Sequence, residues 1–216
     1  MNRIFGIIKK EVLLDLKQKH LVMALLLYVI CNCFIAYKAF NVLPKVTWNA
    51  LVLLIFLFVG LNTILKSFSS RYKNRQLFYY SFYNPVELLI ATLIYNFLLL
   101  FTLSLAIVGT LGLFAGIEIQ NLGLYVASMA LGSLGVSILF SFISLLSIKS
   151  NSNTTIFSIL ALPLALPFMF LMLKINAVAL GLIFDSTVIN DIYIFIGLIL
   201  MFFSLSLITF PTLWKS

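Results

Sequence analysis

Few residues in this chain have side chains suited to catalysis or metal binding. One histidine, His20, two cysteines, Cys31 and Cys33, and six acidic residues are spread over 216 positions. Hydrolytic, nucleotide-binding and metal centres place such residues in patterns such as HExxH, GxSxG and GxxxxGK[ST], and none of these patterns occurs here. On a helix the side chains of Cys31 and Cys33 would lie about 200° apart, too far apart to share a metal or form a normal disulfide. We therefore interpret both cysteines as small apolar packing residues. The sequence therefore predicts no catalytic, cofactor-binding or metal residues, and the chain is not expected to be an enzyme.

The composition indicates a membrane protein. Hydrophobic residues make up 63% of the chain, charged residues 9%, and the mean hydropathy is +1.17. A soluble domain is nearer half apolar and a quarter charged, so a soluble enzyme, a disordered tail and a disulfide scaffold are all disfavoured. The net charge is +8, but the basic residues stand at the ends of apolar runs. We therefore expect no nucleic-acid partner and one membrane domain over residues 1–216.

Six apolar runs are long enough to cross a bilayer, which takes about 20 helical residues. The expected spans are Leu21–Phe40, Val46–Leu65, Val86–Phe114, Leu122–Ile148, Ile156–Leu173 and Ile192–Leu213. These runs are apolar on every face, whereas barrel strands alternate with a period of two. The predicted fold class is an all-α integral membrane protein with six transmembrane helices.

The basic residues predict the orientation of these spans. Eleven Lys and Arg flank one side of the membrane and three flank the other, so the side with eleven is expected to be cytoplasmic. Both termini then lie in the cytoplasm. Trp48 and Tyr125 are expected to mark the outer membrane interface, as aromatic belts do.

Two segments are too polar or too short to be simple spans. Residues 1–20 carry both acidic and basic residues with an apolar face, which predicts a cytoplasmic amphipathic helix lying in the interface; it anchors the chain or also contacts a cytoplasmic partner. His20, at its end, is interpreted as an interfacial polar residue. Residues 176–190 are partly apolar and are expected to form a short outer interfacial or re-entrant helix.

The most informative segment is Lys66–Glu87, a basic and densely aromatic stretch on the predicted cytoplasmic side. So many aromatic rings need a surface to pack on, either the membrane interface or another protein. We interpret the segment as a coupling loop that docks a partner, with a plain interfacial loop as the alternative. The candidate docking residues are Arg71, Lys73, Arg75, Phe78, Tyr79 and Tyr80.

Two patterns inside the spans suggest motion or close packing. Pro163 and Pro167 lie four residues apart in the fifth span, where each removes a backbone hydrogen bond; they form a static kink or a candidate hinge. Four serines in the fourth span share one helical stripe, which predicts either a close helix–helix seam or a polar wall of a translocation path. These serines are Ser133, Ser137, Ser141 and Ser144.

Ionisable residues are missing from the middle of every expected span. All six acidic and all 14 basic residues lie in connections or at span ends. Proton- and ion-coupled carriers place ionisable groups within the bilayer. If this protein moves a cargo, its energy is therefore expected to come from another subunit.

Several stretches resemble a known family. An interfacial N-terminal helix, six spans and a basic aromatic loop after the second span resemble permeases of the ABC-2 exporter class. KKEVLLDLKQKH, LKSFSSRYKN, QNLGLYVASMALGSLGVS and SILALPLALPFMF look like the heme exporter protein B family (CcmB), the permease subunit of the bacterial cytochrome c maturation system. The loop stretch RYKNRQLFYY is basic and aromatic, where many relatives have an acidic residue and a glycine.

The resemblance implies a bacterial inner-membrane subunit that pairs with a second copy and with a separate P-loop ATPase. It also implies a haem-handling membrane subunit and a periplasmic haem chaperone as partners. ATP hydrolysis by the partner would drive haem export or release of the haem-loaded chaperone. No cofactor is expected on this chain itself, and haem would be cargo of the complex.

Three rival functions differ from this expectation. An ABC-2 permease for another cargo, such as a lipid or a polysaccharide, would share the architecture. A secondary carrier is disfavoured because the mid-membrane region holds no ionisable residue. A membrane enzyme is disfavoured because no nucleophile–base or metal-ligand pattern occurs in the sequence.

Overall fold

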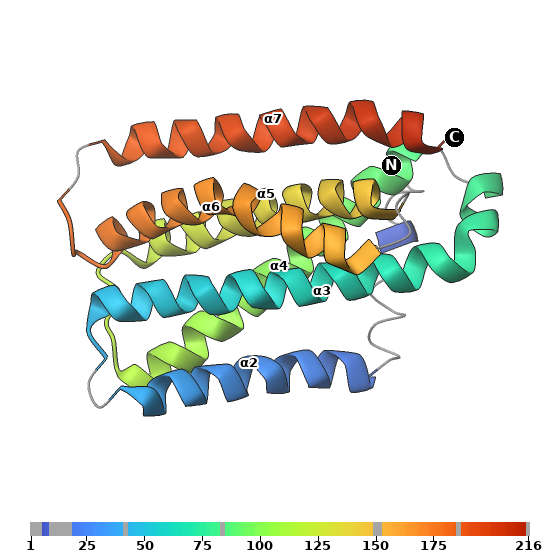
Figure 1. Cartoon of the computed structure of the whole chain (residues 1–216). Coiled ribbons are helices and arrows are strands. Elements are labelled where there is room, and N and C mark those ends of the chain that lie inside the picture. Colours follow the sequence, from blue (N-terminus) through green and yellow to red (C-terminus); the bar gives the residue numbers. More distant parts are fainter. Residues whose placement is uncertain are drawn as a thin grey trace.

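The computed structural model of the chain describes residues 6–8, 19–40, 43–82, 85–148, 153–184 and 187–214. Over these residues the backbone is all-α (Figure 1). Besides a helical segment at residues 6–8, the helices are α2 (Lys19–Ala39), α3 (Lys45–Phe82), α4 (Pro85–Ala115), α5 (Leu122–Ile148), α6 (Asn153–Ala179) and α7 (Val188–Trp214).

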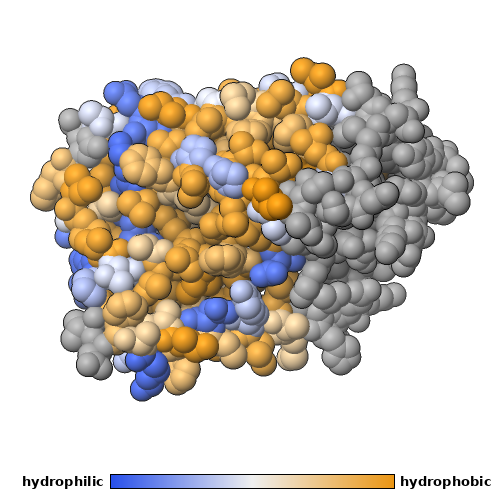
Figure 2. All heavy atoms as spheres, in the orientation of Figure 1, coloured by the Kyte–Doolittle hydropathy of each residue, from blue (hydrophilic) through white to orange (hydrophobic). Residues whose placement is uncertain are grey.

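Among the residues that the structure describes, five helices contain stretches long and apolar enough to cross a membrane. These stretches are Lys45–Ile64, Val86–Ala115, Leu122–Ser144, Phe157–Ala179 and Val188–Thr209. Helix α2 contributes a shorter apolar stretch, Met23–Ala39. Figure 2 shows apolar residues over most of the described surface along the bundle, with many hydrophilic residues at one end and a few along its length. The expectation of a multi-pass helical membrane protein in contact with lipid is therefore confirmed.

The helices run along one bundle whose two ends differ (Figure 1). We call the end that holds the α2–α3, α4–α5 and α6–α7 connections the outer end, and the opposite end the inner end. Residues 6–8 and the C-terminal end of α7 both lie toward the inner end. Ile7 is buried in the core and Ile8 packs against it, so the described part of the N-terminal segment contacts the bundle. The rest of the amphipathic helix predicted over residues 1–20 lies outside the described residues, apart from residues 19 and 20, which begin α2.

Local sequence explains several of the helix ends. Helix α4 begins at Pro85 with Glu87 in its first turn, which suits the free N–H groups and the positive end of the helix dipole. Asn121 caps α5, because its side-chain oxygen accepts a hydrogen bond from the N–H of Leu124 at 3.1 Å. Helix α6 ends near Gly181, whose φ of 72° favours glycine.

Helices α5 and α3 are the most enclosed members of the bundle. Helix α5 packs against α3, α4, α6 and α7, and α3 packs against α2, α4, α5 and α6. About two thirds of the α5 span is buried, against 22% of the α7 span. The bundle therefore leaves the outer faces of α2, α4, α6 and α7 for lipid or for a partner.

Two elements differ from the expectation drawn from the sequence. The segment expected to be a loop after Leu65 continues α3 as a helix to Phe82, because no glycine or proline interrupts it before Pro85. At the other end, residues 176–179 form the last turn of α6 and α7 begins at Val188. The described part of 176–190 therefore holds no separate interfacial or re-entrant helix.

Candidate functional site

The extension of α3 beyond its apolar stretch is the first candidate site. The apolar stretch of α3 ends at Ile64 and the helix continues to Phe82. The extension lies at the inner end of the bundle, where α3 bends in its last turns (Figure 1). It carries all six residues proposed from the sequence to dock a partner: Arg71, Lys73, Arg75, Phe78, Tyr79 and Tyr80. The structure describes their backbone as helical, and their side chains lie outside the part that it describes.

Close packing connects the apolar part of α3 to the rest of the bundle. A Cβ atom added at Gly60 would lie 3.4 Å from Phe140 Cε2 of α5 and 3.6 Å from Leu100 Cδ2 of α4. Val52, Phe56 and other residues of this part are fully buried. A displacement of the inner end of α3 would therefore act directly on the helices around it.

The serine stripe of α5 is buried among protein atoms. Ser133, Ser137, Ser141 and Ser144 are each at most 4% exposed. Three of the hydroxyls donate to backbone carbonyls of α5 itself, and Ser141 Oγ accepts a hydrogen bond of 3.0 Å from Asn96 Nδ2 of α4. In this conformation the stripe makes contacts within and between helices.

Glycines next to this stripe let α5 approach α6 closely. A Cβ atom at Gly132 would overlap the side chain of Met172, and one at Gly135 would lie 2.7 Å from two ring carbons of Phe168. Small residues at such positions bring membrane helices into contact. The two contacts also show that α5 and α6 run antiparallel, with Gly132 opposite Met172 and Gly135 opposite Phe168.

The two prolines proposed as a hinge lie inside an unbroken helix. Pro163 and Pro167 both fall within α6, and both are exposed on its outer face. Ala161 and Ala165, on the opposite face, are fully buried. The proline stretch therefore faces away from the bundle, toward lipid or a partner, and the hinge remains a hypothesis.

A group of polar residues lies buried near the outer end, between α3, α5 and α6. Trp48 and Asn49 come from α3, Tyr125 and Ser128 from α5, and Asn176 from α6, and each is at most 2% exposed. We call these five residues the outer polar cluster. Trp48 and Tyr125, expected to mark the membrane interface, are instead packed inside the bundle with their ring centroids 5.8 Å apart. Their burial corrects that expectation, because packing between helices removes both rings from the surface.

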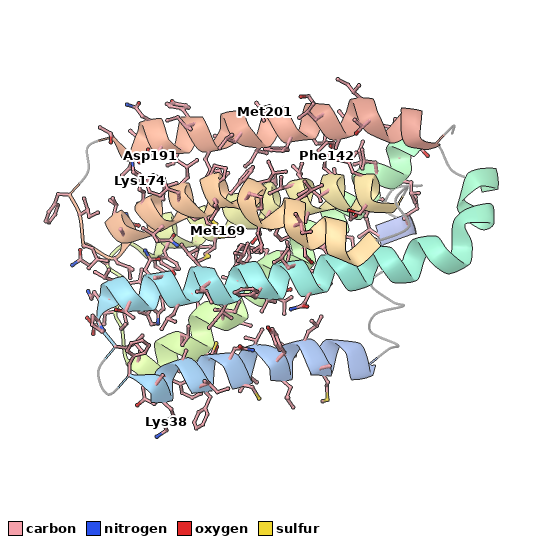
Figure 3. The ribbon with its side chains drawn as sticks, viewed as in Figure 1. Lys38, Phe142, Met169, Lys174, Asp191 and Met201 are labelled. Carbon is pink, nitrogen blue, oxygen red and sulfur yellow. The ribbon has the colours of Figure 1, made fainter. Side chains whose placement is uncertain are left out.

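An ion pair joins α6 and α7 near the same end. Lys174 Nζ lies 3.6 Å from Asp191 Oδ1, and Figure 3 shows the two side chains approaching each other from their helices. Lys174 also lies 5.6 Å from the ring centroid of Phe170. The lysine, which the sequence places in a connection, belongs to α6.

No cluster of three or more His, Cys, Asp or Glu residues suited to a metal occurs among the described residues. Cys33 is buried and accepts a hydrogen bond of 3.2 Å from Thr110 Oγ1, while Cys31 is exposed. The side chain of His20 lies outside the described part.

Comparison with known proteins adds no relative from which a function could be carried over. No family model, no curated protein and no solved structure matches the chain. On its own residues and fold, the chain is a multi-span helical membrane protein.

Proposed function

We propose that this chain is the permease subunit of an ABC transporter complex required for cytochrome c biogenesis. In this proposal α2 to α7 all cross a bacterial inner membrane, with both termini in the cytoplasm and a second copy of the chain in the complex. A separate P-loop ATPase hydrolyses ATP. The resulting motion drives haem export or the release of a haem-loaded periplasmic chaperone.

The observation that carries the proposal is the continuity of α3. One helix connects a buried position in the bundle to a basic, aromatic segment at the inner end. Because α3 contacts four other helices, force applied to its end would reach most of the bundle. An irregular loop at residues 66–82 would transmit such force less directly.

The positions of the charges support an external source of energy. The structure describes six charged side chains, and all of them lie near helix ends or in a connection: Lys38, Lys45, Glu87, Glu118, Lys174 and Asp191. Carriers that couple transport to protons or ions use ionisable groups deeper in the membrane. A partner ATPase would supply the energy that these positions do not.

The cargo proposal rests on the sequence resemblance to the heme exporter protein B family. Its test is deletion of the gene, followed by haem staining of membrane proteins to measure covalently attached haem c. We expect loss of c-type cytochromes, restored by the wild-type gene, with b-type cytochromes unchanged. Normal haem c in the deletion strain would overturn the cytochrome c proposal. Loss of an exported lipid or polysaccharide in that strain would instead favour an ABC-2 permease for that cargo.

A further inference from the structure

The outer polar cluster brings together side chains that are far apart in the sequence. Asn49 Nδ2 of α3 donates a hydrogen bond of 3.1 Å to the backbone oxygen of Leu173 on α6, one turn before Asn176. The ring contact between Trp48 and Tyr125 joins α3 to α5 at the same level.

The register of α5 and α6 places the remaining members together. The N–H of Asn121 donates a hydrogen bond of 2.9 Å to the backbone oxygen of Ala179, and Gly132 faces Met172. Ser128 lies between these two contacts on α5, and Asn176 lies between them on α6. The antiparallel register therefore sets Ser128 opposite Asn176.

Six polar atoms of this cluster have no hydrogen-bond partner among the described residues. They are Trp48 Nε1, Asn49 Oδ1, Tyr125 OH, Ser128 Oγ, and Oδ1 and Nδ2 of Asn176. Each buried polar atom without a partner costs about 1–3 kcal/mol. Ser133 of α5, five residues after Ser128, differs because its hydroxyl donates a hydrogen bond of 2.7 Å to the backbone oxygen of Met129. A few others, such as Thr63 Oγ1 and Glu87 Oε2, lie elsewhere, but most of the unpartnered atoms among the described residues belong to the outer polar cluster.

The chemistry of the cluster selects an uncharged partner. Its atoms include donors and acceptors, and none of its five side chains is ionised. The neighbouring cations are directed elsewhere: Lys45 Nζ lies 3.5 Å from the backbone oxygen of Leu180, and Lys174 pairs with Asp191. A carboxylate or phosphate would find no charge to pair with among these residues. A hydroxyl group, which both donates and accepts, matches the set.

We propose that the outer polar cluster is a binding site for hydroxyl groups, supplied by buried water or by an uncharged polyol. A buried water makes about three hydrogen bonds, so the six atoms would satisfy about two waters or two hydroxyls of a polyol. The bound hydroxyls would link α3, α5 and α6 through exchangeable hydrogen bonds. This site is independent of the proposed function.

The test uses Trp48 as its reporter. The chain has two tryptophans, so Trp214→Phe leaves Trp48 alone. Protein in polyol-free buffer and a detergent without a sugar headgroup is exposed to radiolytic hydroxyl radicals, and oxidation of Trp48 and Tyr125 is measured by mass spectrometry. Bound water would produce oxidation despite burial. Asn176→Leu, which removes two of the six polar atoms, should lower that oxidation several-fold, and Ser133→Ala is the matched control expected to leave it unchanged.

A polyol source is distinguished by titrating glycerol or sucrose while following Trp48 emission. A saturable shift that Asn176→Leu abolishes would assign the hydroxyls to a polyol. Oxidation without any such shift would assign them to water. If Asn176→Leu does not fold, Ser128→Ala replaces it in both experiments. Either of two results would overturn the site: protection of both aromatic rings with no response to polyol, or oxidation and emission that the site variants leave unchanged.

Discussion

The contact between Gly135 and Phe168 makes the packing of α5 against α6 measurable. A Cβ atom at Gly135 would lie 2.7 Å from Cδ1 and Cε1 of Phe168 and 3.3 Å from Cγ1 of Ile199. Phe168 is fully buried, and its ring centroid lies 5.7 Å from those of both Phe195 and Phe202. The ring therefore has little room to move, and Gly135→Ala should destabilise the protein.

A matched glycine isolates the cost of this contact. Gly109 of α4 is exposed, and a Cβ atom there would meet nothing within 4 Å. Alanine raises helix propensity at both positions, by up to about 1 kcal/mol. The difference between Gly135→Ala and Gly109→Ala therefore reports overpacking alone, which typically costs about 1–3 kcal/mol.

The assay is thermal unfolding of both purified variants in the same detergent, followed by circular dichroism. For a chain of this size each kcal/mol corresponds to about 2–4 °C in Tm. We expect Gly109→Ala at or slightly above the wild-type Tm and Gly135→Ala clearly below it. Phe168→Leu should cost less in the Gly135→Ala background than in the wild type, because it relieves the contact. Equal Tm values for the two glycine variants would refute the close packing described here.

Two further predictions concern polar contacts between helices. Lys174→Met should lower the Tm because it leaves the largely buried Asp191 carboxylate without its partner, and adding Asp191→Asn should recover part of the loss. The coupling energy of such a partly exposed pair is about 1 kcal/mol or less. If the effects of the two substitutions on thermal unfolding simply add, the pairing is contradicted. Ser141→Ala should destabilise the protein by about 1–3 kcal/mol because it leaves the buried Asn96 amide without this acceptor, and an unchanged Tm in the same assay would argue against the α4–α5 hydrogen bond.

Much of the span pattern could be predicted from the sequence. The fourth span was expected over Leu122–Ile148, and α5 has the same bounds, because a continuous apolar run ends there in polar residues at both sides. The third span, expected at Val86–Phe114, agrees with α4 to within a residue at each end. The length and composition of the apolar runs are enough to predict the bounds of these two helices.

Elements that depend on local breakers were harder to predict. The charges and aromatic residues of the α3 extension interrupt the apolar run, so the sequence favours a loop there. The usable signal was the absence of glycine and proline between Gly60 and Pro85. In the same way, α6 ends at Ala179, two residues before the left-handed Gly181, and not where its hydropathy falls.

The outer polar cluster could not have been found from the sequence. Its members are separated by up to 128 positions, between Trp48 and Asn176, and only the packing of three helices brings them together. Trp48 and Tyr125 looked like interface residues because amphipathic aromatic rings are common there. Their shared burial is a tertiary property.

We propose that a separate ATPase docks on the α3 extension and drives this chain. Affinity purification of the tagged chain from native membranes in mild detergent, with measurement of the P-loop ATPase that co-purifies, tests this docking. We predict that wild-type protein retains the ATPase and that the triple variant Phe78→Ala, Tyr79→Ala, Tyr80→Ala loses most of it. Phe184→Ala with Tyr193→Ala, two exposed aromatic residues at the outer end, should retain it. Recovery of the ATPase with the triple variant, or transport by the wild-type chain alone in proteoliposomes, would contradict the account.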